Sequence, residues 1–384
     1  MNIEFRDRHE RNRRFLPGSI CQVRLGFTLV ELLVVLFIFL ILAAIALPIV
    51  KGLLSDQKVS TTARAITSYF NAAKNRAIAD GRFVGVRIER ISGDNTDDFN
   101  NVASIRLRQL VGVPAYSGDA ADSKVTFGTI ASGVVTLTFA KTDNQLLSLN
   151  SALPALANPA FRDGDIIEFL GGKQFHLNFA TPTATNVLAS IDLNAPVDGS
   201  VGGTGSVMYP TADVITAIPT SSYRVHRRPV VSSSAPLSFA RGVAIDLNYS
   251  GIGVAGSQFS PVELTSPATN QPIDILFGPD GRVEFMSIDS IGTIGPPSGL
   301  IFLCLGSTDG VREFDTAETD MFTPEPKSPA NILDPESVWI VINPNTGRVV
   351  AAPFATTTNI SSRVAALPLT RSLALLSDTL DAQP

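Results

Sequence analysis

The sequence is poor in the side chains that carry out catalysis or bind metals. Its 384 residues include two cysteines, three histidines and one tryptophan. No pair among His9, His176 and His226 has metal-ligand spacing, and no Cys–His group or Gly-x-Ser-x-Gly turn occurs. These absences favour a protein that is not an enzyme and has no resident cofactor.

The cysteines are too few for a disulfide framework. Cys21 lies close to the N-terminus, and Cys304 lies in the run LIFLCLG, which is typical of a buried strand. If the first 26 residues are removed, Cys304 has no partner within the chain. An exported protein of this kind must be held together by its hydrophobic core alone.

Charged residues are also scarce, at 17% of the chain, and their signs are unevenly placed. The first 26 residues hold six arginines and three acidic residues, and the remainder holds 24 basic and 32 acidic residues. Because the chain after residue 26 has a net negative charge, its electrostatics do not support general binding to nucleic acid.

One segment lacks charge almost completely. Residues 26–50 read GFTLVELLVVLFIFLILAAIALPIV, and Glu31 is their only charged residue. The 19 residues after it approach the length that spans a bilayer, so we expect a transmembrane helix over 27–50. The preceding arginines predict a cytoplasmic N-terminus. A secretory signal peptide would have a shorter apolar run with small residues after it, whereas here the small residue, Gly26, comes first.

A helical stalk is expected to continue beyond this run, over 51–81. Pro48 predicts a kink, which either has no further role or, with Gly52, softens the helix during assembly. Gly81 is a natural helix C-cap. One stripe of apolar residues has helical spacing: Val59, Ala63, Ile66, Phe70, Ala73 and Ala77.

After Gly81 the apolar period changes to two, which predicts a β-rich head over 82–384. Expected strands are 84–88, 104–111, 124–129, 133–140, 166–170, 174–178, 186–193, 243–248, 273–277, 282–286, 299–305, 338–343 and 348–352. Hairpin turns are expected at Gly171–Gly172, Pro279–Gly281 and Asn343–Gly347. Loops are expected at 92–101, 195–210 and 315–335, and a short helix at 370–380 within the tail 361–384.

The pattern Gly26-Phe27-Thr28-Leu29-x-Glu31, followed by an apolar run, resembles the prepilin signal of type IV pilins and type II secretion pseudopilins. The resemblance implies that a prepilin peptidase removes the leader 1–26 between Gly26 and Phe27 and then N-methylates Phe27. It also implies that Glu31 pairs with the new N-terminal ammonium of a neighbouring subunit. The alternative is that Glu31 is a tolerated charge near the membrane interface.

Parts of the head are similar to H-type minor pseudopilins and FimT-like minor pilins. The resemblance rests on AAKNRAIADGRFVGVRI, on ARGVAIDLNYSG with IDILFGPDGRVEF, and on VWIVINPNTGRVVAAPF, which look like the stalk junction, the central strand pair and the closing hairpin. It implies an α+β, lollipop-like fold, with a long N-terminal helix packed on an antiparallel head. The head is larger than is usual in that family, with an insert at about 91–235.

The resemblance implies a minor subunit of a secretion pseudopilus or pilus-like filament, in a bacterial inner membrane, with a single span and an extracytoplasmic head. Implied partners are the prepilin peptidase, other subunits, the inner-membrane assembly platform and membrane lipid, with no nucleic acid by default. The alternative function is an adhesive or DNA-binding pilin, for which the basic run Arg224, His226, Arg227 and Arg228 would be the candidate surface. The acidic run Asp309–Asp320 is either a calcium site or a solvated loop.

Overall fold

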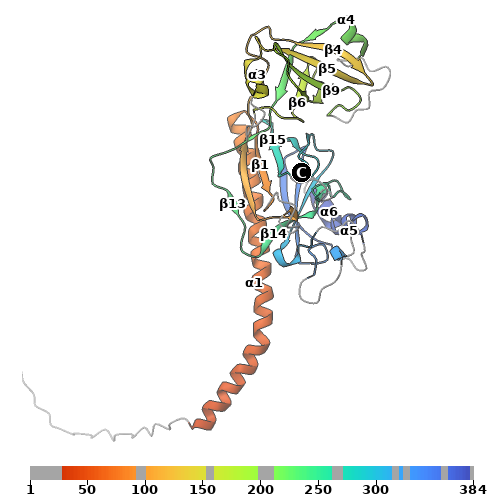
Figure 1. The fold of residues 1–384 in the computed structure, drawn as a ribbon. Coiled ribbons are helices and arrows are strands. Elements are labelled where there is room, and N and C mark those ends of the chain that lie inside the picture. The colour runs from red at the N-terminus through yellow and green to blue at the C-terminus, as the bar shows by residue number, and fades with distance from the viewer. Residues whose placement is uncertain are drawn as a thin grey trace, which may run out of the picture. The chain divides into compact units, whose positions relative to one another are not determined.

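The computed structural model describes residues 28–91, 101–152, 160–197, 212–261, 271–313, 320–322, 329–355 and 362–380. Side chains are described in these ranges except at 45–56, 150–152, 212–214, 320 and 377–380. The chain divides into two compact units, Met1–Leu53 and Leu54–Pro384. An N-terminal helix and antiparallel sheets make up the described part, as Figure 1 shows, and this is compatible with the expected α+β class.

The helix α1 runs from Leu29 to Asp80, 52 residues, or about 78 Å at 1.5 Å per residue. Gly81 follows with φ of +62°, the left-handed conformation of a C-cap, so the predicted end of the helix is confirmed. The kink predicted at Pro48 and part of the predicted span 27–50 lie outside the described side chains. In the part of the chain that the structure describes, no helix is long and apolar enough to qualify as a membrane span.

The stalk stripe of α1, the six apolar residues from Val59 to Ala77, is buried in the largest core of the second unit. The Phe70 and Phe277 rings meet edge to face there, with centroids 6.4 Å apart. The first sheet of this core has the order β12-β3-β1-β15-β16-β17, with β13 also paired to β3. Its strands are β1 (Val84–Glu89), β3 (Arg106–Val111), β12 (Val230–Val231), β13 (Leu237–Ser238), β15 (Ile273–Phe277), β16 (Val283–Ser287) and β17 (Ile294–Gly295).

A second antiparallel sheet, in the order β2-β14-β18-β19-β20, contributes its inner face to the same core. Its outer face is covered by the C-terminal helices α5 (Arg363–Thr370) and α6 (Ser372–Leu380). Its strands are β2 (Ala103–Ser104), β14 (Val243–Ile252), β18 (Ile301–Ser307), β19 (Val338–Asn343) and β20 (Arg348–Pro353). Two short 3-10 helices, Thr308–Gly310 and Asp320–Phe322, follow β18.

Arg371, between α5 and α6, joins those helices to the second sheet. Its guanidinium lies over the rings of Phe302 and Trp339, at 4.5 and 4.7 Å from their centroids. It donates hydrogen bonds to the backbone carbonyls of Tyr249, Gly253, Val254 and Gly256. Burial lowers the pKa of this guanidinium to about 9. The backbone oxygens and the ring faces together compensate a charge that has no water around it.

The insert forms a separate core within the second unit. One sheet has the order β10-β4-β5-β9-β8 and the other the order β11-β6-β7, and Figure 1 shows β4 and β5 side by side. The strands are β4 (Val125–Ala131), β5 (Val134–Ala140), β6 (Ile166–Phe169), β7 (Gln174–His176), β8 (Asn178–Ala180), β9 (Asn186–Asp192), β10 (Thr220–Ser221) and β11 (Tyr223–His226). The helices are α3 (Gln145–Ala152) and α4 (Ala212–Ala217).

Each predicted strand has a counterpart in the structure, and the three predicted hairpins are confirmed. Gly171, Gly172, Gly281 and Gly347 have positive φ, the conformation that their turns require. Five short strands were not predicted: β10, β11, β12, β13 and β17. Most are two residues long, which is too short to show a period.

Three predictions about strands need correction. The expected strand 104–111 is interrupted at Ile105, and its parts, β2 and β3, lie in different sheets. The expected strand 174–178 likewise divides into β7 and the start of β8. The segments ARGVAIDLNYSG and IDILFGPDGRVEF are not a strand pair, because β14 pairs with β18 and β2 whereas β15 pairs with β1 and β16. Local periodicity cannot reveal a change of sheet.

The expected loop 315–335 contains the 3-10 helix Asp320–Phe322, and its described residues 329–335 form no helix or strand. In its described part, Met321, Phe322 and Ile332 are buried in the core between the second sheet and the C-terminal helices. The expected loops at 92–101 and 195–210 lie almost entirely outside the described residues.

Replacing Phe70 with alanine should destabilise the second unit by about 3–5 kcal/mol, because it opens a cavity in a core that cannot collapse around a rigid helix. The matched control is Ile78→Ala, at an exposed position on the same helix, which should change stability by less than about 0.5 kcal/mol. The free energy of unfolding can be followed through the single tryptophan, Trp339, in the full chain in non-ionic detergent. Equal effects of the two substitutions would contradict the packing.

Candidate functional site

The start of α1 is set by a side-chain cap. The Thr28 hydroxyl oxygen accepts a hydrogen bond from the backbone N–H of Glu31, at 3.2 Å, and the Thr28 carbonyl accepts one from Leu32. This is the arrangement of an N-cap residue, which satisfies an N–H group that has no partner within the helix. The cap places Glu31 in the first turn, where a negative charge interacts favourably with the positive end of the helix dipole.

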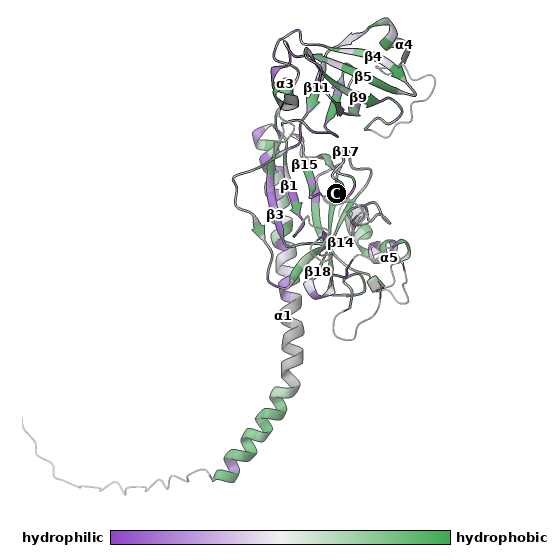
Figure 2. Ribbon diagram, viewed as in Figure 1, coloured by the Kyte–Doolittle hydropathy of each residue, from purple (hydrophilic) through white to green (hydrophobic). Residues whose placement is uncertain are grey.

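The surface around Glu31 is apolar on all sides of the helix. Every described large hydrophobic side chain from Leu29 to Leu42 is exposed, with Leu29 at 80% and Phe39 at 68% of its full area. Figure 2 shows these turns in the hydrophobic colour. A shallow apolar hollow of about 350 Å³ runs along one face, lined by Leu29, Leu32, Leu33, Leu36, Phe37 and Leu40.

This surface is far more apolar than a surface facing water. Monomeric soluble proteins rarely expose a contiguous apolar patch above a few hundred Å². The segment must therefore be covered by lipid or by other protein. Glu31 is the carboxylate within it, and none of the described cationic groups forms an ion pair with it. A charge buried in such surroundings needs a counter-charge from outside the described residues.

The other predicted N-terminal site residues are not in the described part. Gly26 and Phe27 lie just before it, and Pro48 lies among the helical residues whose side chains it does not include. Their predicted roles in cleavage, methylation and helix bending therefore stay predictions.

Residues 22–47 match the sequence profile of the prokaryotic N-terminal methylation motif. The motif supports a type IV pilin-like or pseudopilin-like precursor. It covers the predicted cleavage point, Glu31 and most of the exposed apolar helix, so profile and geometry concern the same residues. Comparisons with curated proteins and with solved structures found no match. The FimT-like subtype therefore rests on the short sequence patterns alone.

The histidines and Cys304 have ordinary structural surroundings. His226 Nε2 lies 2.7 Å from a carboxylate oxygen of Glu168, and His176 Nδ1 lies 3.2 Å from the carbonyl oxygen of Gly164. His9 is outside the described residues. Cys304 is fully buried in β18, as expected, and burial raises the pKa of its thiol.

The basic run 224–228 does not form one exposed patch. Arg224 is exposed on β11, whereas His226 is paired with Glu168. Arg227 donates to the carbonyl of Pro114, and Arg228 donates to the carbonyl of Asp163. His226, Arg227 and Arg228 are thus half-buried and bonded to other protein groups, which does not favour a surface that tracks phosphates along a nucleic acid.

The acidic run Asp309–Asp320 is described only at its two ends. Asp309 is exposed in a 3-10 turn, and residues 314–319 are not described. Among the described residues, no cluster of three or more His, Cys, Asp or Glu side chains could hold a metal ion. The predicted alternatives, a calcium site and a solvated loop, are therefore not decided by the described residues.

A buried carboxylate beside this run was missed by sequence reasoning. Asp246 is completely buried in β14, and it accepts hydrogen bonds from Asn331 Nδ2 and from the Asn248 N–H, both at 3.1 Å. Asn248 in turn donates to the carbonyl of Arg312, at 2.8 Å. This cluster attaches β14 to Arg312, which lies within the acidic run, and to Asn331, which follows the run. The one available signal was an aspartate inside an otherwise apolar strand, AIDLN.

Burial raises the pKa of Asp246 to about 7, against its ordinary value of 3.8, and the hydrogen bonds from Asn331 and Asn248 offset this only in part. The folded state therefore holds a proton that the unfolded state loses above pH 4. This proton stabilises the folded state fully at a pH below the pKa of Asp246 in the unfolded chain. The stabilisation is lost as the pH rises toward the pKa of Asp246 in the folded protein.

We expect the free energy of unfolding to fall by on the order of 2–4 kcal/mol between pH 4 and pH 8 on account of Asp246. Asp246→Asn, which is neutral throughout, should flatten this dependence. The matched control, Asp309→Asn, removes an exposed carboxylate from the same region and should leave the slope unchanged. Unfolding curves of the full chain over this pH range measure the effect, and an unchanged slope in Asp246→Asn would contradict it.

Proposed function

We propose that the chain is a minor pilin or pseudopilin, a structural subunit of a secretion pseudopilus or a pilus-like filament. The observation that carries the proposal is Glu31, one carboxylate in the first turn of α1, where the large side chains from Leu29 to Leu42 are apolar and exposed. The methylation motif at 22–47 supports the same assignment. The apolar turns anchor the precursor in a bacterial inner membrane and afterwards pack against neighbouring helices in the filament.

Glu31 and the mature N-terminus act as a pair in this proposal. A prepilin peptidase cuts between Gly26 and Phe27 and methylates Phe27, which creates an ammonium group one turn before Glu31. Since the carboxylate has no cation among the described residues of its own chain, the ammonium of an adjacent subunit is its natural partner. Pairing in an apolar surrounding sets the axial register between subunits, because a shift of one turn leaves both charges uncompensated.

The head contributes an enlarged surface rather than a catalytic centre in this proposal. The stalk stripe couples α1 to the head core, so the head moves with the helix that assembles. Partners are the other subunits and the inner-membrane assembly platform. An adhesive or nucleic-acid-binding pilin is less well supported, because only Arg224 of the basic run is exposed on the surface.

Glu31→Gln should abolish or strongly reduce incorporation into filaments while leaving membrane insertion unchanged, because it removes the charge and keeps the size of the side chain. Glu31→Asp retains the charge and should keep partial assembly. The measurement is the fraction of chain in sheared filaments against the membrane fraction, in cells that carry the assembly machinery. Normal filament incorporation of Glu31→Gln would refute the assembly role and favour a plain membrane anchor.

The mature chain should begin at Phe27 and carry one additional methyl group on its amine. N-terminal mass spectrometry of the protein from membranes tests this directly. Gly26→Ala is retained at full length if the peptidase requires a glycine before the cut. An intact Met1 in the wild-type protein, or a cut beyond Pro48, would contradict the proposed processing.

A further inference from the structure

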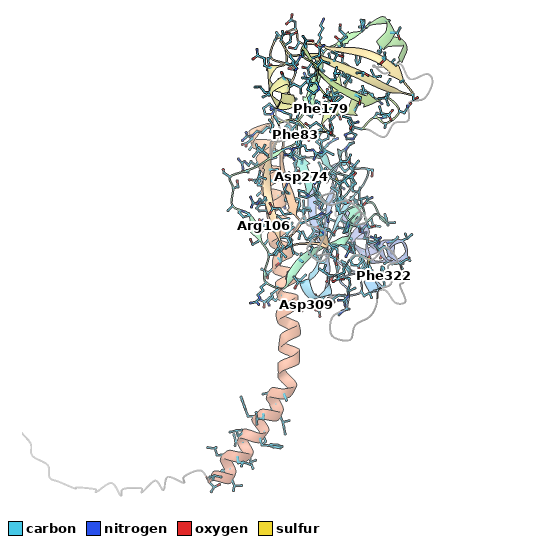
Figure 3. The ribbon with its side chains drawn as sticks, in the orientation of Figure 1. Phe83, Arg106, Phe179, Asp274, Asp309 and Phe322 are labelled. Carbon is cyan, nitrogen blue, oxygen red and sulfur yellow. The ribbon has the colours of Figure 1, made fainter. Side chains whose placement is uncertain are left out.

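A cavity of about 530 Å³ lies in the second unit, at the end of the first sheet where β1 ends and β3 begins. Figure 3 labels Arg106, one of its lining residues, on β3. Its charged lining residues are Glu89, Arg90, Arg106 and Arg241. Three cations against one carboxylate give the lining a formal charge of +2. The chain as a whole has the opposite sign, with a net charge of −5.

Arg241 is the cation of this lining that has no counter-ion. Its side chain is exposed, and it forms no ion pair with any described carboxylate. Its backbone is nevertheless held in place by a tight turn, which the Val243 N–H closes by donating to the Ala240 carbonyl at 3.1 Å. The Gly242 carbonyl of this turn accepts a hydrogen bond from the Thr308 N–H, at 3.0 Å. The guanidinium of Arg241 therefore stands on a fixed support beside the cavity.

Arg106 is only partly neutralised. Its Nε atom is 2.5 Å from one carboxylate oxygen of Glu89, and the Nε atom of Arg108 is 2.9 Å from the other. One carboxylate thus serves two guanidinium groups, whose side chains are 45% and 37% exposed. The contact of Arg106 uses Nε alone, so its Nη donors are left for a ligand.

A serine hydroxyl lies in the same row of the sheet. Ser238 on β13 is directly opposite Arg106 on β3, and Arg106 is directly opposite Glu89 on β1. Side chains that are directly opposite in an antiparallel pair lie on the same face of the sheet. Ser238 therefore adds an uncharged donor next to the Arg106 guanidinium, and both residues line the cavity.

Arg90 supplies a buried positive charge behind these donors. Its guanidinium donates to the backbone carbonyls of Asn101, Phe259 and Gln271. Burial lowers its pKa to about 10, so it is still protonated at neutral pH. Carbonyl dipoles hold this cation in place of a carboxylate, so its charge adds to the positive potential in the cavity.

Apolar side chains form another part of the wall. Ile91 and Ile105 line the cavity and are 37% and 43% exposed, and Phe239 lines it while packing against the main core. The volume is in the range of small-molecule sites, which combine apolar walls with a few convergent polar groups. The lining therefore suits an anionic group that carries an apolar body.

We propose that this cavity binds an organic phosphate ester, with the phosphate oxygens among Arg106, Arg241 and Ser238 and the carbon body against the apolar wall. Guanidinium groups recognise phosphate through paired N–H donors. A phosphate monoester carries close to two negative charges at neutral pH, which matches the lining better than the single charge of a carboxylate. This inference does not depend on the proposed role in filaments.

The test is binding of three probes to the full chain in non-ionic detergent at constant ionic strength. Phenyl phosphate has a phosphate and an apolar body, inorganic phosphate lacks the body, and benzoate replaces the phosphate with one carboxylate. We expect phenyl phosphate to bind more tightly than either of the others in calorimetry and to raise the unfolding temperature. No binding of phenyl phosphate, or equally tight binding of benzoate, would overturn the proposal.

A phosphate ester can come from a soluble metabolite or from a lipid headgroup. The two sources are separated by repeating the phenyl phosphate measurement with the full chain in phosphatidylcholine bicelles, with and without phosphatidic acid. Weaker binding of phenyl phosphate in the presence of phosphatidic acid would support the site and assign it to a lipid headgroup. Equal binding in the two kinds of bicelle would support the site and assign it to a soluble ester.

Matched variants locate the site. Arg241→Gln should weaken phenyl phosphate binding by about tenfold or more, because a charge-assisted hydrogen bond is lost. Arg224→Gln removes an exposed arginine from β11 in the insert and should change binding by less than about twofold. Equal losses in the two variants would indicate a general effect of net charge and would overturn the cavity assignment.

Glu89→Gln gives the opposite sign and covers the case in which Arg241→Gln does not fold. It removes the carboxylate that competes with the ligand for Arg106, while the glutamine oxygen can still accept a hydrogen bond from the Arg106 Nε–H. Binding of phenyl phosphate should therefore tighten severalfold, which a purely structural role of Glu89 would not produce. Unchanged or weaker binding in this variant would overturn the proposal.

Discussion

The burial of one stripe of α1 is the constraint on which the rest of the head depends. Six apolar residues, from Val59 to Ala77, share a core with the inner faces of two sheets that do not pair with each other. Because a helix offers only one such stripe, the sheets must both approach the same face. Small residues at positions 63, 73 and 77 allow close contact, and Phe70 fills the space between them. The helix is thereby a structural element of the head as well as its connection to the N-terminal segment.

Much of this arrangement could be predicted from local pattern. The helix end at Gly81, the stripe and the hairpin turns each depend on residues within about twenty positions of one another, so the sequence displays them directly. The division of 104–111 between β2 and β3 could not be foreseen, because β3 pairs with β1 whereas β2 pairs with β14, which is far away in the chain. The same holds for β12 and β13, whose two-residue pairings cover an edge of β3.

The candidate sites likewise divide into those that the sequence could predict and those that it could not. Glu31 was found from sequence because its meaning lies in a continuous apolar run, and the cap from Thr28 adds only its exact position in the helix. The surroundings of Asp246 could not be predicted, since its partner Asn331 comes from a segment 85 residues away. In the basic run 224–228, closeness in the sequence does not mean one shared surface. Its members are adjacent in sequence, but Arg224 is exposed, His226 contacts Glu168, and Arg227 and Arg228 donate to backbone carbonyls.

The contacts of Arg371 have a consequence for the order in which the protein can fold. Its guanidinium closes the outer face of the second sheet, and its acceptors lie 115 to 122 residues earlier in the chain. The first sheet has the same character, since Arg87 meets Asp274 across 187 residues. The hydrogen bonds of α1 join residues within the helix, whereas the head can close only when the chain is present as far as Arg371.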